Sequence, residues 1–256
     1  QKKHILSQRE EEILALSAEV GNAASDIFTM FNNADIKFPF ITDENGEEVE
    51  LTKGRYIKFL ESKERRVRKD AFHALYSTYE KHKNTLATML TSNVKTNRFY
   101  SIVRKYSSCL EASLDSDNIS TEVYDKLIDT VNRNLVLLHR YVKLRKKALK
   151  LDELHMYDLY VPIVDEPKKH IYYEEALDLV KKGLRPLGDE YAGYLENAFK
   201  SGWIDVFENQ GKTSGAYSWG AYMTHPYVLL NYQGTVNDVF TIAHEMGHAM
   251  HSFYTN

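Results

Sequence analysis

Apolar residues recur every three or four positions along most of the chain. This spacing places side chains on one face of a helix, because an α-helix has 3.6 residues per turn. The pattern predicts two long helices within residues 52–105 and single helices elsewhere. The other predicted helices cover residues 4–34, 120–151, 172–182, 186–199 and the segment from residue 236 onward. We therefore expect a mainly α fold.

Two shorter segments break the helical period and predict β-structure. Between residues 38 and 51, apolar residues flank an acidic turn that contains Asn45-Gly46, a pair that favours a tight hairpin. Residues 226–232 predict a strand, because Tyr227, Val228, Leu229 and Leu230 form an apolar run within them. Pro226 lacks an N–H donor, which is typical of an edge strand. A glycine-rich loop, residues 211–221, precedes this strand.

The last predicted helix carries the residues with the clearest chemistry. His244 and His248 are four residues apart, so both imidazoles lie on the same side of the helix, about one turn apart. Zinc binds imidazole nitrogen readily, and catalytic zinc sites keep one of four positions open. The pair therefore predicts a zinc site. Two core histidines in a structural helix are the alternative.

Glu245 follows His244 directly and completes the H-E-x-x-H sequence, the signature of zinc metallopeptidases. Its position beside the histidine row lets the carboxylate reach a zinc-activated water without binding the metal. We expect Glu245 to act as the general base, which takes a proton from that water and passes it to the leaving amine.

The same segment predicts one apolar helix face, and it offers no third zinc ligand. His251 lies seven residues after His244, about 10 Å along the helix, so we assign it to packing or to the surroundings of the site. Position 254 is tyrosine, which excludes the metzincin pattern. An upstream His, Asp or Glu stays open as a ligand. The residues expected on the apolar face are Val236, Val239, Phe240, Ala243, Gly247 and Met250.

The first and last residues of the sequence offer a reason why no third zinc ligand was found. The chain begins with Gln1 rather than Met and stops eight residues after His248. We therefore expect a fragment of a longer polypeptide that stops before the third ligand. In this interpretation residues 1–200 form a mostly helical body with the hairpin near 38–51. Residues 201–256 begin a zincin-like catalytic region, with the edge strand and the histidine helix, truncated at its C-terminus.

Composition and charge restrict the binding partners and the cellular location that we expect for this protein. The net charge of −3 gives no electrostatic case for binding nucleic acid. No apolar run is long enough to span a bilayer, so no membrane association is expected. The single cysteine, Cys109, excludes an internal disulfide and fits a cytoplasmic location.

Segments along nearly the whole chain carry a family resemblance. They are Leu51–Tyr56, Arg65–Ala71, Tyr157–Tyr160, Leu187–Tyr191, Trp203–Val206, Gly211–Ser218, His225–Tyr232 and His244–His251. Together they resemble the oligoendopeptidase F branch of the M3 family of zinc metallopeptidases, with thimet oligopeptidase as a more distant relative.

The resemblance implies a mainly α fold, with an elongated multi-helix body, a deep substrate channel and a small β-sheet beside the zinc-binding helix. It implies a metalloendopeptidase that hydrolyses internal bonds of short unfolded peptides. One Zn²⁺ per active site would sit on His244 and His248, with Glu245 as the base. The third ligand would be a glutamate on the next helix, beyond Asn256.

The resemblance also places the substrate groove. We expect the glycine-rich loop and the strand after it to line this groove, because a peptide can add to a strand edge by main-chain hydrogen bonds. The candidate substrate-binding residues are Gly215, Ala216, Tyr217, Tyr227, Leu229 and, as a lesser candidate, His225. A histidine that caps the strand before Pro226 is an equally good interpretation of His225. A non-catalytic peptide-binding module with a residual motif is the alternative function.

Overall fold

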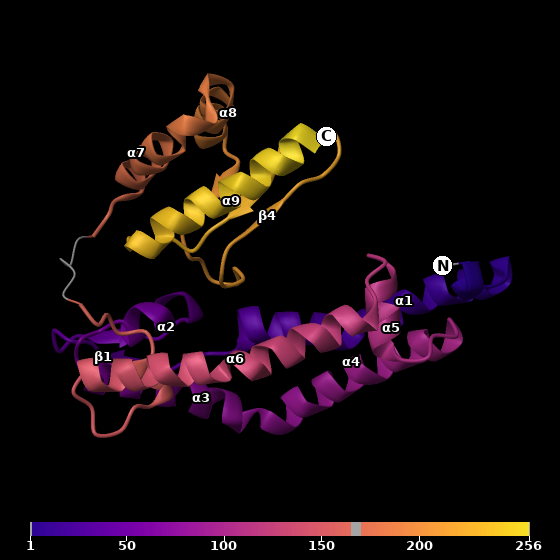
Figure 1. Ribbon diagram of the computed structural model, residues 1–256, viewed down its shortest axis with the longest axis horizontal. Helices are drawn as coiled ribbons and strands as arrows, with labels where there is room; N and C mark the ends of the chain where they lie inside the picture. The colour runs from indigo at the N-terminus through magenta and orange to yellow at the C-terminus, as the bar shows by residue number, and fades with distance from the viewer. Residues whose placement is uncertain (1, 165–169, 256) are drawn as a thin grey trace. The chain divides into compact units, whose positions relative to one another are not determined.

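The computed structural model describes residues 2–164 and 170–255, and it confirms the predicted mainly α fold (Figure 1). The chain divides into two compact units. Unit 1 consists of Gln1–Lys37 with Tyr76–Leu159, and unit 2 consists of Phe38–Leu75 with Tyr160–Asn256. Helix α3, Arg65–Lys81, runs from the second unit into the first. None of the described helices is both long and apolar enough to cross a bilayer.

Among its described residues, unit 1 contains helices joined by turns and loops, and no strand. Helix α1 packs along α4, and α5 contacts both α4 and α6. The α-helices are α1 Gln8–Met30, α4 Lys83–Val103, α5 Cys109–Asp115 and α6 Thr121–Ala148. The short turns are η1 Lys2–His4, the π-turn η2 Phe31–Asp35 and η3 Met156–Asp158.

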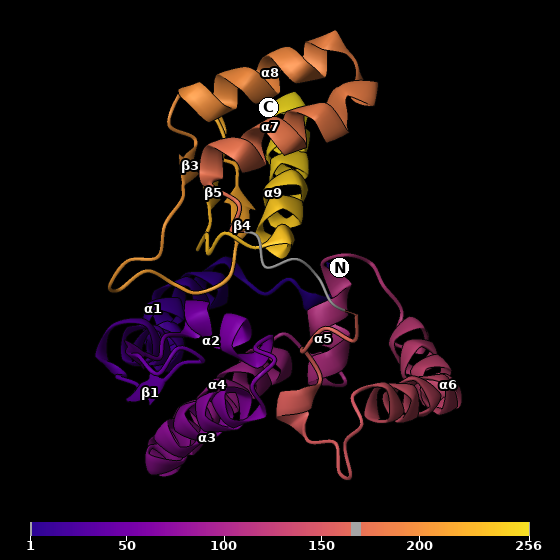
Figure 2. The same cartoon turned by 90° about the vertical axis from the view of Figure 1, so that its left-hand side faces the viewer.

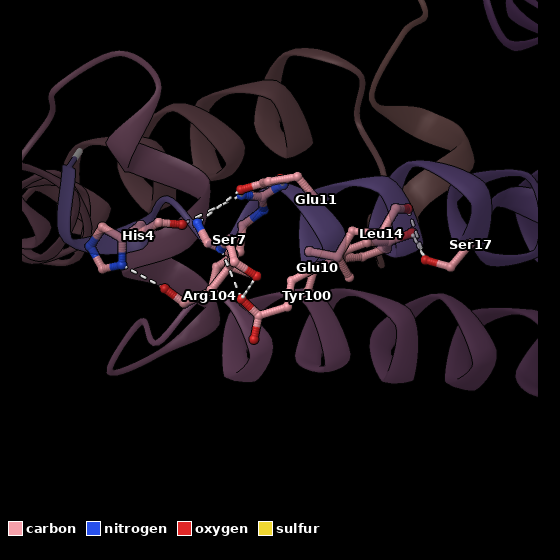
Figure 3. Close-up of polar contacts among 9 residues, drawn as sticks. His4, Ser7, Glu10, Glu11, Leu14, Ser17, Tyr100 and Arg104 are labelled. Atoms are coloured by element: carbon pink, nitrogen blue, oxygen red, sulfur yellow. Dashed lines mark hydrogen bonds and ion pairs between the residues drawn. The ribbon is translucent and has the colours of Figure 1, made fainter.

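Polar contacts fix the start of α1 against the end of α4 (Figure 3). The Glu10 carboxylate accepts hydrogen bonds from the Ser7 N–H at 2.8 Å and the Ser7 hydroxyl at 2.6 Å, so the helix begins with a capping arrangement. Arg104 donates to both oxygens of Glu11, at 3.0 and 2.8 Å. The Arg104 carbonyl lies 2.7 Å from Nδ1 of the buried His4. These contacts orient α1 on α4.

The predicted pair of helices within residues 52–105 is in fact three helices: α2 Lys53–Leu60, then α3 and α4. The break after α2 is polar. The Ser62 hydroxyl accepts a hydrogen bond from the Glu64 N–H at 3.3 Å, and Arg68 donates to the Ser62 carbonyl at 2.7 Å. A serine that satisfies nearby backbone groups in this way competes with continued helix.

Unit 2 contains the predicted hairpin and a small sheet. Strand β1, Phe40–Thr42, pairs antiparallel with β2, Glu48–Glu50, so the hairpin is confirmed. The sheet has the order β3-β5-β4, with β3 parallel and β4 antiparallel to β5. Its strands are β3 Ile204–Asp205, β4 Tyr217–Trp219 and β5 Tyr227–Leu229. The helices are α7 Tyr173–Leu184, α8 Asp189–Lys200 and α9 Val236–Thr255, with the 3₁₀ turn η4 Arg185–Leu187.

The predicted edge strand, residues 226–232, is not at the edge. It forms β5 in the centre of the sheet, and β4, which lies in the segment expected to be a loop, is an edge strand. Pro226 does not disturb the centre because it precedes Tyr227, the first paired residue, so no ladder hydrogen bond is lost.

The core of unit 2 forms between the sheet and helices α7, α8 and α9 (Figure 2). Val228 and Leu230 of the central strand segment enter it from the sheet. The helices contribute Ala176, Val180, Leu195, Ala198, Ile242, Met246, Ala249 and Met250. This packing holds α9 against the sheet.

Candidate active site

The start of α9 is fixed by a reciprocal cap. The Asp238 carboxylate accepts hydrogen bonds from the Thr235 N–H at 2.7 Å and from its hydroxyl at 2.8 Å. The Asp238 N–H donates back to the Thr235 hydroxyl at 3.2 Å. This arrangement satisfies N–H donors at the start of the helix, and the Asp238 carboxylate interacts favourably with the positive end of the helix dipole.

The buried face of α9 agrees only in part with the predicted one. Met250 is buried as predicted, and Val239 and Ala243 are partly buried against the core. Val236, Phe240 and Gly247 are exposed, and Ile242, Met246 and Ala249 are buried in their place. Phe240 is 71% exposed. It lies four residues before His244 and so shares the stripe of the histidine pair. Burial of that stripe would have placed both imidazoles in an apolar core, which is unfavourable without polar partners.

His244 and His248 converge on one point at the exposed face of α9. Their Nε2 atoms are 3.1 Å apart, and the rings are nearly perpendicular, with centroids 4.7 Å apart. Two imidazole nitrogens bound to one tetrahedral zinc at ordinary bond lengths are separated by about 3.3 Å. The donor set therefore fits two positions of a zinc ion. Across residues 2–164 and 170–255, no group of three or more His, Cys, Asp or Glu side chains is arranged to hold a metal.

Glu245 lies next to this pair and is only 7% exposed. It follows His244 directly in α9 and so lies beside the stripe of the histidine pair. Its role as the general base stays a prediction.

Several predicted substrate-binding residues lie together on β4 and β5. Tyr217 is directly opposite Leu229 in the sheet, and Tyr227 is directly opposite Trp219. The three aromatic side chains are exposed, and Trp219 is 68% exposed. Trp219 was missed in the sequence, although its alternation with Tyr217 is the signal of a strand face.

The free edge of β4 follows from the hydrogen bonds of β5. The Val228 N–H donates to the carbonyl of Trp203, the residue before β3, and the Leu230 N–H donates to the carbonyl of Asp205 in β3. The backbone groups of Tyr227 and Leu229 therefore point to β4, and those of Ser218 point away from the sheet. Ala216 and Gly220 flank this strand, outside its paired residues.

Gly220 marks where β4 approaches the end of α9. A Cβ atom at this position would lie 2.7 Å from Cβ of Ser252. The lack of a side chain permits this close approach. At the other end of β4, Gly215 has a positive φ of +89°, which glycine adopts without strain.

His225 packs between aromatic rings. It stacks on Trp203, with ring centroids 5.2 Å apart and an interplanar angle of 4°. The centroid of the Tyr227 ring lies 4.4 Å from that of the His225 ring. Its Nδ1 lies 2.7 Å from the Pro226 carbonyl. These contacts describe the structural alternative for His225, and substrate contact stays a prediction.

Comparison with known proteins decides the family. The model of peptidase family M3 matches residues 58–256, and the model described as oligopeptidase F matches residues 1–38. The chain belongs to peptidase family M3. The resemblance found in the sequence is thereby confirmed, and M3 peptidases are generally metallopeptidases.

Curated relatives from this family are similar over the whole chain. Oligopeptidase PepF of Bacillus subtilis (strain 168) is 52% identical over 100% of this chain and 38% of its own length. Group B oligopeptidase PepB of Streptococcus agalactiae is 46% identical, over 99% of this chain and 42% of its own length. The M3 chain described here thus spans about two fifths of the length of these relatives.

Solved structures of similar proteins also match this chain. Oligoendopeptidase-F from Enterococcus faecium is 45% identical, with a TM-score of 0.63 over 78% of this chain and 37% of its own. PZ peptidase A, solved with an inhibitor, has a TM-score of 0.77 over 96% of this chain and 43% of its own. At 21% identity, that second likeness concerns the fold alone.

Proposed function

We propose that this M3 protein is a zinc-dependent endopeptidase that hydrolyses internal bonds of short unfolded peptides. The observation that carries the proposal is the pair of Nε2 atoms of His244 and His248, 3.1 Å apart on the exposed face of α9 beside Glu245. The printed names of the relatives, oligopeptidase and oligoendopeptidase, support the substrate class.

His244 and His248 would hold the zinc ion through their Nε2 atoms. Zinc supplies Lewis acidity, which makes a water more acidic and polarises a carbonyl group. A catalytic zinc site has three protein ligands. The described residues provide no complete set, so the proposal requires one ligand from outside them.

Glu245 would serve as the general base. Its carboxylate accepts a proton from the attacking water and then donates it to the nitrogen of the leaving amine. It follows His244 directly in α9, beside the stripe of the histidine pair, and is only 7% exposed.

The edge of β4 would hold the substrate backbone. Ser218, flanked by Ala216 and Gly220, presents main-chain groups that an extended peptide can pair with, as in β-augmentation. Tyr217, Trp219, Tyr227 and Leu229 would contact the side chains of that peptide from the strand face, and Gly215 would let the loop approach its backbone.

The first test replaces Glu245 by Gln in the full-length enzyme. We expect bound zinc to stay stoichiometric, because the histidines are unchanged, and hydrolysis of a quenched fluorescent peptide to fall about 10²- to 10⁴-fold. His244→Ala and His248→Ala should instead lose the metal. Glu19→Gln, an exposed change on α1, is the matched control and should leave both measurements unaltered. Normal turnover by the Glu245→Gln enzyme would rule out the proposed base.

The incomplete ligand set favours one second candidate, a peptide-binding module without catalysis. Metal analysis of the full-length protein separates the two. Peptide binding without stoichiometric zinc would support the module, and stoichiometric zinc with chelator-sensitive cleavage would support the peptidase.

A further inference from the structure

Ser218, in the middle of β4, has a buried hydroxyl group. Its oxygen has no hydrogen-bond partner in the part of the chain that the structure describes. A buried hydroxyl that loses its hydrogen bonds to water destabilises the folded protein unless another polar group replaces them. The unpaired hydroxyl therefore indicates a polar neighbour with which it interacts in the active enzyme.

The Ser218 side chain lies on the face of the sheet that packs against α9. Ser218 is directly opposite Val228, and directly opposite residues direct their side chains to the same face. Val228 is buried in the core that the sheet forms with α7, α8 and α9, and α9 contacts β4. Tyr217 and Trp219 alternate to the other face and are exposed. The hydroxyl therefore lies between β4 and α9, away from the free edge of the strand.

Two contacts define how β4 aligns with α9. After the strand, a Cβ atom at Gly220 would lie 2.7 Å from Cβ of Ser252. Before the strand, Ala216 and Thr241 line one cavity of about 210 Å³ within unit 2. The wall of this cavity also includes Gly215 and, from α2, Lys53. Strand β4 and helix α9 therefore lie side by side and run in the same direction (Figure 1).

One stripe of α9 joins these two contacts. Its members are spaced by four, three and four residues, which places them on one side of a helix. They are Thr241, Glu245, His248 and Ser252. Ser218 is halfway between the two residues of the β4 segment that make the contacts, and halfway along the stripe is the interval between Glu245 and His248. The buried hydroxyl therefore lies beside these two residues.

Glu245 is the more suitable partner of the two. It is only 7% exposed, whereas His248 is exposed and has its Nε2 atom 3.1 Å from that of His244. A hydroxyl forms a stronger hydrogen bond with a charged carboxylate than with a neutral group. A carboxylate also has two oxygens, so one can accept from Ser218 while the other accepts a proton from the attacking water.

We propose that Ser218 is a positioning residue for Glu245. Its hydroxyl donates a hydrogen bond to one carboxylate oxygen and so orients the other oxygen toward the water. A base that is held in position before the transition state lowers the entropic part of the barrier. The inference rests on the proposed function, because it requires Glu245 to be the general base.

The test begins with Ser218→Ala in the full-length enzyme. We expect kcat for a quenched fluorescent peptide to fall about 10- to 100-fold, the size of one hydrogen bond to a charged group. KM should not change, because the hydroxyl does not face the free edge of β4. The dissociation constant for zinc, measured by competition with a chromophoric chelator, should also stay at the parent value, because the histidines are unchanged.

Threonine and valine provide a matched pair at position 218. Both are β-branched and have nearly the same shape, but only threonine has a hydroxyl. Ser218→Thr should retain the kcat of the parent, and Ser218→Val should match Ser218→Ala. Any strain from the added methyl group is common to both variants, so their ratio isolates the hydroxyl. Ser113→Ala, an exposed change on α5, is the control and should behave like the parent.

A double variant shows whether the hydroxyl acts through Glu245. In the Glu245→Gln background, Ser218→Ala should not lower the residual rate further, because the base that the hydroxyl orients is already absent. A hydroxyl that acts elsewhere would lower the rate by the same factor in both backgrounds.

Four results would overturn the inference. They are equal kcat for the parent and Ser218→Ala, equal kcat for Ser218→Thr and Ser218→Val, a full Ser218→Ala effect in the Glu245→Gln background, and weaker zinc binding in Ser218→Ala. The last result would assign the hydroxyl to His248 instead. Failure of the proposed function is visible without any change at position 218: the parent does not cleave the peptide, or Glu245→Gln cleaves it at the normal rate.

Discussion

Gly234 shows how a single residue secures the framework of the site. Its φ is +82°, and a methyl group at this position would collide with the ring of His170. Its carbonyl accepts a hydrogen bond from the Ile171 N–H at 3.0 Å, which ties the chain before α7 to the chain before α9. Only glycine satisfies both the backbone conformation and the space.

Replacement of Gly234 by Ala should therefore destabilise the protein by about 1–3 kcal/mol, through left-handed strain together with the steric clash. Urea unfolding followed by circular dichroism measures the change. Gly193→Ala is the contrasting variant: Gly193 is exposed within α8, with open space around it, and alanine there should stabilise by about 0.5–1 kcal/mol. A Gly234→Ala protein as stable as the parent would contradict this account.

At the level of single residues, the convergence of the two histidines could be predicted from the sequence. His244, Glu245 and His248 are identifiable because helical spacing alone brings the two imidazoles together. The cavity lined by Lys53 and Gly215 was not identifiable, because it brings together segments more than 150 residues apart in the sequence. Local periodicity carries no information about such contacts.

Among the elements, α7 and the chain segment after β5 are joined by aromatic rings. Tyr173 at the start of α7 meets Tyr232 edge to face with centroids 5.5 Å apart, and Phe207 lies 6.3 Å from the Tyr173 ring. The Tyr232 hydroxyl donates to the Ile171 carbonyl at 2.8 Å. Burial raises the pKa of Tyr173 to about 12, and it does the same for Tyr232.

This cluster predicts a loss of stability in alkali. Between about pH 10 and pH 12 the unfolded chain has released the tyrosine protons while the folded chain still holds them. The unfolded state then binds fewer protons, so the free energy of unfolding falls as the pH rises through this window. Tyr173→Phe removes one of the two groups and should reduce the slope. Thermal unfolding across this range, with tyrosinate absorbance, provides the measurement, and an unchanged slope in Tyr173→Phe would count against it.

The errors at the level of elements have physical reasons. The apolar run of residues 226–232 predicted a strand correctly, but its place in the sheet depended on β4, which is only three residues long and lies among glycines. In α9, two neighbouring stripes are both apolar, and periodicity does not choose between them. Contact with α7 and the sheet selects the stripe of Ile242 and Met246.

Across the whole molecule, apolar side chains are distributed unevenly. Helix α9 buries Ile242, Met246, Ala249 and Met250 in the core of unit 2. Helix α6 is longer, at 28 residues, yet Arg145 is its one buried side chain among the residues described. Its exposed apolar residues include Leu127, Val131, Val136, Leu137, Leu138 and Leu144. Helices in water derive most of their stability from packing, so length does not compensate for this difference.

We therefore expect amide hydrogens of α6 in the 256-residue chain to exchange at least about 10²-fold faster than those of α9, because local opening of α6 disrupts few buried contacts. Hydrogen–deuterium exchange with peptide-level mass spectrometry measures both helices in one experiment. Helix α4 is the internal reference: it has 21 residues, lies in the same unit as α6 and packs along α1, and it should exchange more slowly than α6. Equal protection of α4 and α6 would mean that packing against described residues does not govern the stability of these helices.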